Sequence, residues 1–407
     1  MKNIKICVCG ITCSGKTTLL NQVAHKFDIE FIEGSKNLRK IGNIQTREEL
    51  QFIHKNNAPL IQKLRSKFAK YIKNLSSDKI IIVDGHYSFI KENEQYEVAM
   101  SDDDFSAYDV ILFLHCDIEK VQERLEQRDN KIISKNDLKK WYEFELEGLK
   151  QQCRKHNILF GIIDDEVDYV GQFLRDLNSK PEFLMPNDIF KKFYSSYEKI
   201  LLPHKKIFVV DCDDTLANQD GVKLFYKIPE MSSYKIPNAF VNHRFYGLYQ
   251  FFKLTQKRLE IDEAKFYKSC QIAANEIVLY KNLIDFLTSM NIPVIAITAG
   301  IRAIWDFVFK KYNLNFLLVA NDRYTCICKE TKTYFVQKLV SLGYEVIVIA
   351  NGKVDIGMFE NANISFLMDS REKDEVLKYL SQAAYNKMKE INHNTSFEEM
   401  LHFIKGQ

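Results

Sequence analysis

Residues 4–18 read IKICVCGITCSGKTT, an apolar run that enters a glycine-containing loop and then a helical pattern. The segment from Gly10 to Thr18 matches the spacing G-x-x-x-x-G-K-[ST]. Glycines at these places let the backbone N–H groups converge on phosphates at the start of a helix. We therefore predict a buried strand over 4–10, a helix over 16–26, and a phosphate-binding loop (P-loop) between them.

Each position of this loop has an expected role toward a bound nucleotide. Lys16 is expected to reach the β- and γ-phosphates, and the Thr17 hydroxyl is expected to hold Mg²⁺. A glycine turn with no ligand is the alternative, but strand, motif and helix in register favour nucleotide binding. The predicted ATP-binding residues are Gly10, Thr12, Cys13, Ser14, Gly15, Lys16, Thr17 and Thr18.

The rest of the first half alternates apolar runs with helical patterns, which favours a parallel α/β sheet. The helical patterns include one long amphipathic helix over 50–75 and a closing helix over 167–177. Further strands are expected over 29–34, 79–86, 108–116 and 158–164.

Two features after the P-loop bear on the reaction. KIIIVDGH (79–86) places Asp84 where a strand ends, as a Walker-B-like acid or a base for a substrate hydroxyl. The later helix VQERLEQRD carries Arg124 and Arg128. These patterns resemble the adenylate-kinase-like small kinases. That resemblance covers about residues 1–175 and implies that Arg124 or Arg128 neutralises the transferring phosphoryl group; either arginine is otherwise a solvated helix charge.

The same resemblance implies where the phosphoryl acceptor binds. Glu33, Ser35 and Arg39 follow the second strand, so they are acceptor-site candidates. No NKxD motif stands in a plausible place, which disfavours a GTPase, and no arginine-rich sensor region suggests a ring ATPase.

VVDCDDTLA (209–217) opens the second half, and it resembles the first motif of haloacid-dehalogenase (HAD) phosphatases. The resemblance implies that Asp211 is the nucleophile and that Asp213 is the general acid and base. Both are expected at one Mg²⁺ ion, with Thr215 holding the turn. The second acid, at the +2 position, favours phosphatase over dehalogenase chemistry.

The remaining HAD-like motifs follow in order. Thr298 in AITAG matches the hydroxyl that binds a phosphoryl oxygen, and Lys332 matches the family lysine, with Lys329 as its competitor. The fourth motif resembles phosphoserine phosphatases but departs from them. Asn351 stands where that motif has an acid, and only Asp355 is retained. Both are candidate Mg²⁺ ligands, but the uncharged Asn351 predicts weaker metal binding and phosphatase activity that is weak, altered or lost.

These motifs predict two doubly wound α/β domains. We expect the P-loop kinase-like domain at 1–180, a linker at 181–204, and the HAD-like domain at 205–407. A helical cap is expected over about 217–283, whose aromatic residues favour a packed cap core. Strands of the second domain are expected over 206–216, 292–300, 316–322 and 345–352.

Composition limits the other classes of function. The net charge of +3 lacks the basic excess of a dedicated nucleic-acid binder, which disfavours nucleic acid as a partner. No apolar run is long enough to span a membrane, and the first residues lack a signal-peptide pattern, so we predict a cytoplasmic protein with no membrane partner. The nine scattered cysteines favour apolar packing over zinc binding or disulfides.

The sequence therefore predicts a bifunctional, Mg²⁺-dependent enzyme. The first domain would transfer phosphate from ATP to a small-molecule or nucleotide acceptor, and the second would hydrolyse a small phosphomonoester. One rival is a polynucleotide 5′-kinase and 3′-phosphatase of nucleic-acid end repair, which shares this domain order. Another is a nucleotide-binding regulatory protein with a degenerate phosphatase domain, which Asn351 suggests.

Overall fold

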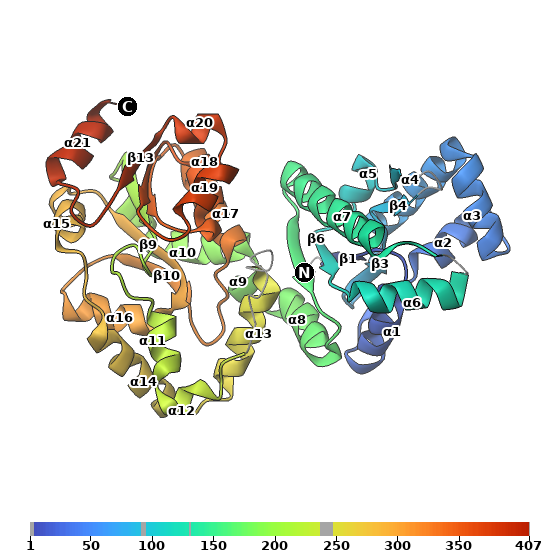
Figure 1. Cartoon of the computed structure of the whole chain (residues 1–407), viewed down its shortest axis with the longest axis horizontal. Helices are drawn as coiled ribbons and strands as arrows, with labels where there is room; N and C mark the ends of the chain where they lie inside the picture. The colour runs from blue at the N-terminus through green and yellow to red at the C-terminus, as the bar shows by residue number, and fades with distance from the viewer. Residues whose placement is uncertain (1–3, 91–94, 130–131, 237–246, 407) are drawn as a thin grey trace. The chain divides into compact units, whose positions relative to one another are not determined.

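The computed structural model describes residues 4–90, 95–129, 132–236 and 247–406, and it divides into two compact units, Met1–Ser179 and Lys180–Gln407 (Figure 1). Each unit contains its own parallel sheet with helices around it. The prediction of two doubly wound α/β folds is confirmed. No helix in the described ranges combines the length and the apolarity that crossing a membrane requires.

The sheet of the first unit has the strand order β2-β3-β1-β6-β7, and every neighbouring pair is parallel. Parallel strands end at the same edge of a sheet, so the loops after β1 and β3 meet there. The strands are β1 (Lys5–Cys9), β2 (Glu30–Ile32), β3 (Ile81–Asp84), β6 (Val110–Leu114) and β7 (Leu159–Ile163).

The helices around this sheet differ from the prediction at one place. The single helix expected over 50–75 is wrong: it is broken at Asn57, whose side chain accepts the N–H of Leu60 at 3.1 Å and caps a new helix with Pro59 in its first turn. The elements are α1 (Lys16–Lys26), α2 (Gly34–Gly42), α3 (Arg47–Asn56), α4 (Ala58–Asn74), α5 (Asp102–Phe105), α6 (Ile118–Asp129), α7 (Lys135–His156) and α8 (Val167–Ser179), with a hairpin of β4 (Ser88–Ile90) and β5 (Tyr96–Val98).

The sheet of the second unit has the order β10-β9-β8-β11-β12-β13, also parallel throughout. The chain direction across the sheet reverses between β8 and β11, and such a reversal creates a crevice for ligands at the carboxyl ends of the strands. The strands are β8 (Lys206–Val210), β9 (Val294–Ile301), β10 (Leu317–Asn321), β11 (Glu345–Ala350), β12 (Ile364–Met368) and β13 (Met388–Ile391).

Alternate side chains of β8 enter two separate cores. Phe208 and Val210 pack with helices α15, α16 and α21, whereas Ile207 and Val209 pack with α10, α17, α18 and α19. Two apolar layers around β8 therefore fix it at the centre of the sheet. The helices are α10 (Pro186–Leu201), α15 (Lys281–Ser289), α16 (Arg302–Lys311), α17 (Lys329–Ser341), α18 (Ile356–Asn361), α19 (Lys373–Tyr379), α20 (Gln382–Tyr385) and α21 (Phe397–Gly406).

The segment 181–204 is part of the second unit instead of the expected linker. It forms α9 (Pro181–Leu184) and α10, and α10 buries Ile189, Phe190 and Phe193 in the core shared with α17. Each of these two helices has a proline in its first turn, where proline favours the start of a helix. The prolines therefore mark helix starts and not a flexible stretch.

A helical insertion separates β8 from β9. It contains α11 (Gly221–Lys227), α12 (Pro229–Ser232), α13 (Leu248–Leu259) and α14 (Glu263–Glu276). Of its aromatic residues, Phe225, Tyr249 and Phe252 are buried, whereas Phe240, Phe245 and Tyr246 lie outside the described residues.

Candidate active sites

The P-loop connects β1 to α1 and depends on unusual backbone angles. Gly10 and Gly15 have φ values of 152° and 98°, and Cys13 has φ of 63°. Glycine adopts such angles at no steric cost, which is why the two motif glycines stand at these places. The resulting loop ends at the first turn of α1, where N–H groups and the helix dipole favour an anion.

Lys16 lies in this loop with its ammonium group buried. Its Nζ donates to the backbone carbonyls of Gly10 (2.5 Å) and Ile11 (3.1 Å). Burial lowers the pKa of Lys16, and the charges of Glu145 and Asp84 oppose that shift. The ammonium thus sits in the loop that is expected to receive phosphates.

Asp84 brings the end of β3 to the P-loop. Its Oδ2 accepts the Thr17 hydroxyl at 2.8 Å, and its Oδ1 accepts the N–H of Gly34 at 2.6 Å. A Cβ at Gly34 would stand 2.5 Å from the Asp84 carbonyl oxygen, so only glycine allows this close approach. Of the two roles predicted for Asp84, this contact favours the Walker-B-like acid that orients the Mg²⁺-binding hydroxyl.

The two candidate arginines differ in position along their helix, and the three acceptor-site candidates differ in their surroundings. Arg124 on α6 donates to the Cys13 carbonyl at 3.1 Å, so it lies against the P-loop, and Arg128 follows one turn later. Ser35 lines a cavity at the carboxyl edge of the sheet. Glu33 precedes α2 as its N-cap residue, and Arg39 donates to the Gln45 carbonyl at 3.0 Å.

Glu145, on α7, is a site residue that the sequence reasoning missed. It is fully buried, and its Oε1 accepts the N–H of Tyr87 at 2.9 Å, while Oε2 has no hydrogen-bond partner among the described residues. Burial raises the pKa of Glu145 to about 7, and Lys16 opposes that shift. The available signal was its spacing: it stands on the same face of the helix as Leu138, Trp141 and Leu149.

Glu145→Gln is expected to remove a pH dependence of stability in the first unit. The folded chain retains a proton that an unfolded glutamic acid, with a pKa near 4.5, releases, so this group reduces stability as pH rises from about 4.5 to about 7. The loss in the natural protein is up to about 3 kcal/mol over that window. Urea unfolding at pH 5 and pH 8, followed by Trp141 fluorescence in a Trp305→Phe background, measures it.

Glu147→Gln is the matched control for this experiment because Glu147 lies on the same helix with its side chain 64% exposed. An equal pH slope in the Glu145→Gln protein and in the control would contradict the role of Glu145.

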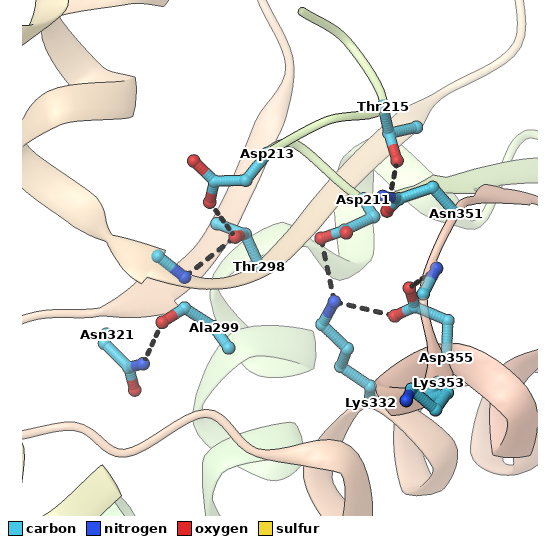
Figure 2. Close-up of polar contacts among 12 residues, drawn as sticks. Asp211, Asp213, Thr215, Thr298, Ala299, Asn321, Lys332, Asn351, Lys353 and Asp355 are labelled. Carbon is cyan, nitrogen blue, oxygen red and sulfur yellow. Dashed lines mark hydrogen bonds and ion pairs between the residues drawn. The ribbon is translucent and has the colours of Figure 1, made fainter. Parts of the chain in front are cut away.

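The second site is built around Asp211, directly after β8. Lys332, from the first turn of α17, lies 2.7 Å from Asp211 and 2.7 Å from Asp355, and all three are buried (Figure 2). Its competitor Lys329 is partly exposed and lies beside Glu330 at 3.6 Å. The structure therefore brings Lys332, and not Lys329, to the candidate nucleophile.

Asp213 and Thr298 also meet at this edge, as Figure 2 shows. The Thr298 hydroxyl donates to Asp213 Oδ2 at 3.0 Å, and the N–H of Gly221 donates to Oδ1 at 2.7 Å. Burial, followed by the charge of Asp220, raises the pKa of Asp213 to about 6. A carboxyl group with that pKa exchanges protons near neutral pH, which suits a general acid and base.

The two candidate metal ligands of the fourth motif, Asn351 and Asp355, have different partners in the structure. Asn351 Oδ1 accepts the Thr215 hydroxyl at 2.9 Å and remains at the mouth of the site. Asp355 is fully buried, with Oδ1 on Lys332 and Oδ2 on the N–H of Gly352 at 3.1 Å. Both oxygens of Asp355 therefore accept hydrogen bonds, and one of them orients the Lys332 ammonium.

The charges of this site fit a divalent cation. Burial raises the pKa of Asp211 to about 8, and the carboxylates of Asp355 and Asp213 add to that shift. Burial alone would lower the pKa of Lys332, but the two carboxylates it touches outweigh burial and raise it. Lys332 contacts two of the three acids, Asp211 and Asp355, so the site has an excess of negative charge when all three are ionised.

The donor atoms fit Mg²⁺ as well, because they are oxygens. Asp211 and Asn351 would hold the ion, with a backbone carbonyl of the turn 211–213. Within the described ranges no cluster of three or more His, Cys, Asp or Glu side chains is arranged to bind a metal, in keeping with an amide at position 351.

Asn321, at the end of β10, is a second residue that the sequence reasoning missed. It is fully buried and donates to the Ala299 carbonyl at 2.5 Å (Figure 2). It also accepts the N–H of Ile327. It thereby holds the end of β9, which carries Thr298. A lone Asn after a strand has no motif around it, so no signal in the sequence distinguished it.

Comparisons with known proteins agree with these two folds. Residues 9–140 match a family model described as an AAA domain. A comparison with curated proteins found no match. This match lies within the first unit and includes its P-loop, and the two strand orders confirm two doubly wound α/β folds.

Similar solved structures include enzymes of both kinds. A substrate-bound phosphoserine phosphatase is 14% identical, with 49% of this chain and 98% of that chain covered and a TM-score of 0.35. Shikimate kinase from Acinetobacter baumannii, in complex with shikimate, is 13% identical, with 43% and 92% covered and a TM-score of 0.31. A gluconokinase from Sinorhizobium meliloti is 19% identical, with 44% and 97% covered and a TM-score of 0.26.

Proposed function

We propose that this chain is a bifunctional enzyme, an ATP-dependent kinase followed by a HAD-type phosphatase that acts on a small phosphomonoester. The observation that carries the proposal is that two complete sets of phosphate-handling side chains stand at the carboxyl edges of two separate sheets. Lys16, Thr17 and Asp84 form the first set, and Asp211, Asp213 and Lys332 form the second.

In the kinase, the chain's own groups bind and orient the triphosphate. The P-loop N–H groups surround it and the Lys16 ammonium offsets its charge. Arg124, which donates to the Cys13 carbonyl of this loop, would offset the charge on the transferring group. Thr17, oriented by Asp84, would hold Mg²⁺. An acceptor hydroxyl would approach from the cavity that Ser35 and Asp84 line.

In the phosphatase, Asp211 attacks phosphorus and the ester oxygen leaves with a proton from Asp213. Asp213 then takes a proton from water, whose oxygen attacks the aspartyl phosphate and releases inorganic phosphate and Asp211. Lys332, held by Asp355, offsets the negative charge of nucleophile and substrate. Bound Mg²⁺ supplies further positive charge at the phosphoryl oxygens.

Phosphoryl transfer to a panel of acceptors tests this proposal. The full chain is incubated with labelled ATP and nucleosides, sugars or 5′-hydroxyl oligonucleotides, and p-nitrophenyl phosphate hydrolysis is assayed in parallel. Transfer to a small molecule together with hydrolysis supports the proposal. Transfer to oligonucleotides alone would indicate nucleic-acid end repair, and ATP binding with neither activity would indicate a regulatory protein.

Asn351→Asp is expected to tighten Mg²⁺ binding by about tenfold and to raise turnover of generic phosphomonoesters. An acid at this position adds one negative charge to the oxygen ligands, and it still accepts the Thr215 hydroxyl. In the natural protein, the oxygens of Asp355 already accept hydrogen bonds from Lys332 and from the N–H of Gly352. Titration of Mg²⁺ against turnover for both proteins measures the effect.

A slower Asn351→Asp protein would contradict the charge deficit. It would show instead that Asn351 contacts the substrate and that an acid there repels its phosphate. Ser370→Ala is a control, because that hydroxyl donates to the backbone carbonyl of Asn351 at 2.8 Å, accepts the N–H of Glu372 at 3.2 Å and carries no charge to the metal.

A further inference from the structure

A cavity opens beside the P-loop, at the carboxyl edge of the first sheet. Its empty volume, which includes open solvent at the mouth, is about 640 Å³. Helices α2, α3, α4 and α5 and the segment after β3 contribute its walls. Most of these walls are apolar or aromatic, and they include Leu50, Ile61, Phe68, Phe89, Met100 and Tyr108.

Two opposite charges stand together in this apolar wall. Arg65 on α4 and Asp104 on α5 both line the cavity. Burial lowers the pKa of the Arg65 guanidinium, and the nearby charge of Asp104 opposes that shift. Between residues that the structure describes, the Arg65 guanidinium has no hydrogen bond or direct ion pair, although a buried guanidinium ordinarily has several.

Asp104 retains one oxygen for a ligand. Its Oδ2 accepts the N–H and the hydroxyl of Ser101, at 2.8 and 3.0 Å, which fixes the orientation of the carboxylate. Its Oδ1 accepts no hydrogen bond from the described residues. The lining of this cavity therefore includes a planar donor and a carboxylate acceptor.

The pair restricts the charge of the ligand. A carboxylate or phosphate placed on Arg65 would meet the negative Asp104, and a cation placed on Asp104 would meet Arg65. A neutral group with a hydrogen-bond acceptor next to a donor satisfies both, with two charge-assisted hydrogen bonds. The edge of a nucleobase has this pattern, and proteins hold such bases between aromatic and apolar side chains.

The opposite part of the cavity borders the P-loop. Asp84 lines it while holding Thr17, and His86 lines it beside Gly10. The His86 Nδ1 is buried with no partner within the described ranges, and burial keeps this ring neutral by lowering its pKa well below the usual value. These groups suit an uncharged hydroxyl next to the phosphoryl donor.

We propose that the phosphoryl acceptor is a free nucleoside, with its base between the aromatic walls on Arg65 and Asp104 and a sugar hydroxyl beside Asp84 and His86. This inference rests on the kinase function proposed above. The hydroxyl oxygen bonds to the γ-phosphorus of ATP, the bond from that phosphorus to the β–γ bridging oxygen breaks, and ADP leaves. The hydroxyl proton is released to solvent.

Direct binding tests the cavity without relying on catalysis. Calorimetry of the full chain without ATP uses cytidine, adenosine, guanosine and uridine as probes, with ribose and benzoate as a sugar and a planar anion that lack the base edge. At least one nucleoside is expected to bind, and more tightly than ribose or benzoate. Benzoate binding without nucleoside binding, or no binding at all, would overturn the inference.

Variants assign the binding to the charged pair. Arg65→Met is expected to weaken nucleoside binding roughly 10- to 100-fold, the range for loss of a paired base contact, with ATP binding unchanged. Arg65→Lys keeps the charge but not the planar fork, so an intermediate loss is expected. The control Lys67→Met removes an exposed cation from the same helix. Unchanged nucleoside affinity in both folded Arg65 variants would contradict the assignment.

Labelled ATP separates the two proposals. Nucleoside binding without transfer to any acceptor would refute the kinase function but leave the nucleoside site. Transfer to sugars or acids, but not to nucleosides, would keep the kinase and refute the nucleoside. A 5′-hydroxyl oligonucleotide presents the same base and sugar at a strand end, so labelling of the oligonucleotide alone would overturn the free nucleoside in favour of a strand terminus.

Discussion

Asp211→Asn is expected to reduce phosphomonoester hydrolysis by a factor on the order of 10³ or more, while ATP binding persists. An amide in place of this carboxylate is a poor nucleophile, so no aspartyl phosphate forms. The loss should not come from unfolding, because Lys332 keeps its contact with Asp355. Hydrolysis of p-nitrophenyl phosphate and trapping with beryllium fluoride measure the two consequences.

Asp214→Asn is a close control for this variant. Asp214 belongs to the same turn, is partly exposed and faces Lys223 at 4.0 Å, away from the contacts of Lys332. Its φ of 54° is also one that asparagine tolerates. Hydrolysis should survive this change, and undiminished hydrolysis in the folded Asp211→Asn protein would exclude the aspartyl-phosphate mechanism.

Lys16→Ala is expected to reduce phosphoryl transfer by a factor on the order of 10² or more and to leave p-nitrophenyl phosphate hydrolysis intact. The ammonium is the positive charge that the P-loop itself carries, whereas Thr17, Asp84 and Arg124 remain in place. Transfer is followed with labelled ATP and the best acceptor of the panel.

Lys26→Ala is the control for Lys16, because Lys26 ends the same helix, where it is exposed and paired with Asp168. Loss of both activities in a folded Lys16→Ala protein would show that the two sites are coupled or wrongly assigned.

The fold was predictable because its deciding signals are local. The run 4–18 joins an apolar strand, a phosphate-binding turn and a helix within one stretch of chain, and VVDCDDTLA does the same for the second unit. The apolar repeat of a strand or a helix spans only a few residues, so it can be recognised in the sequence whatever the segment packs against. The same reasoning failed at 50–75, where Pro59 begins a second helix, and at 181–204, where α10 contributes Phe190 to a core.

Local sequence patterns could not choose between two candidate residues of the same type. Lys329 and Lys332 lie on one helix, as do Arg124 and Arg128, and their spacing alone does not show which member faces a distant loop. Packing of α17 against the sheet turns Lys332 toward Asp211, 121 positions away in sequence.

By itself, therefore, the sequence determined two α/β folds, and it placed the candidate nucleophilic, basic and metal-binding residue types within their motifs. Only the tertiary structure decided that Glu145 lies near the P-loop, that Asp355 contacts Lys332, and that Arg65 and Asp104 line one cavity. The physical reason is that motif spacing fixes groups a few bonds apart, whereas burial and partners depend on which helix faces which sheet. Those contacts join residues far apart in the chain, and no local pattern records them.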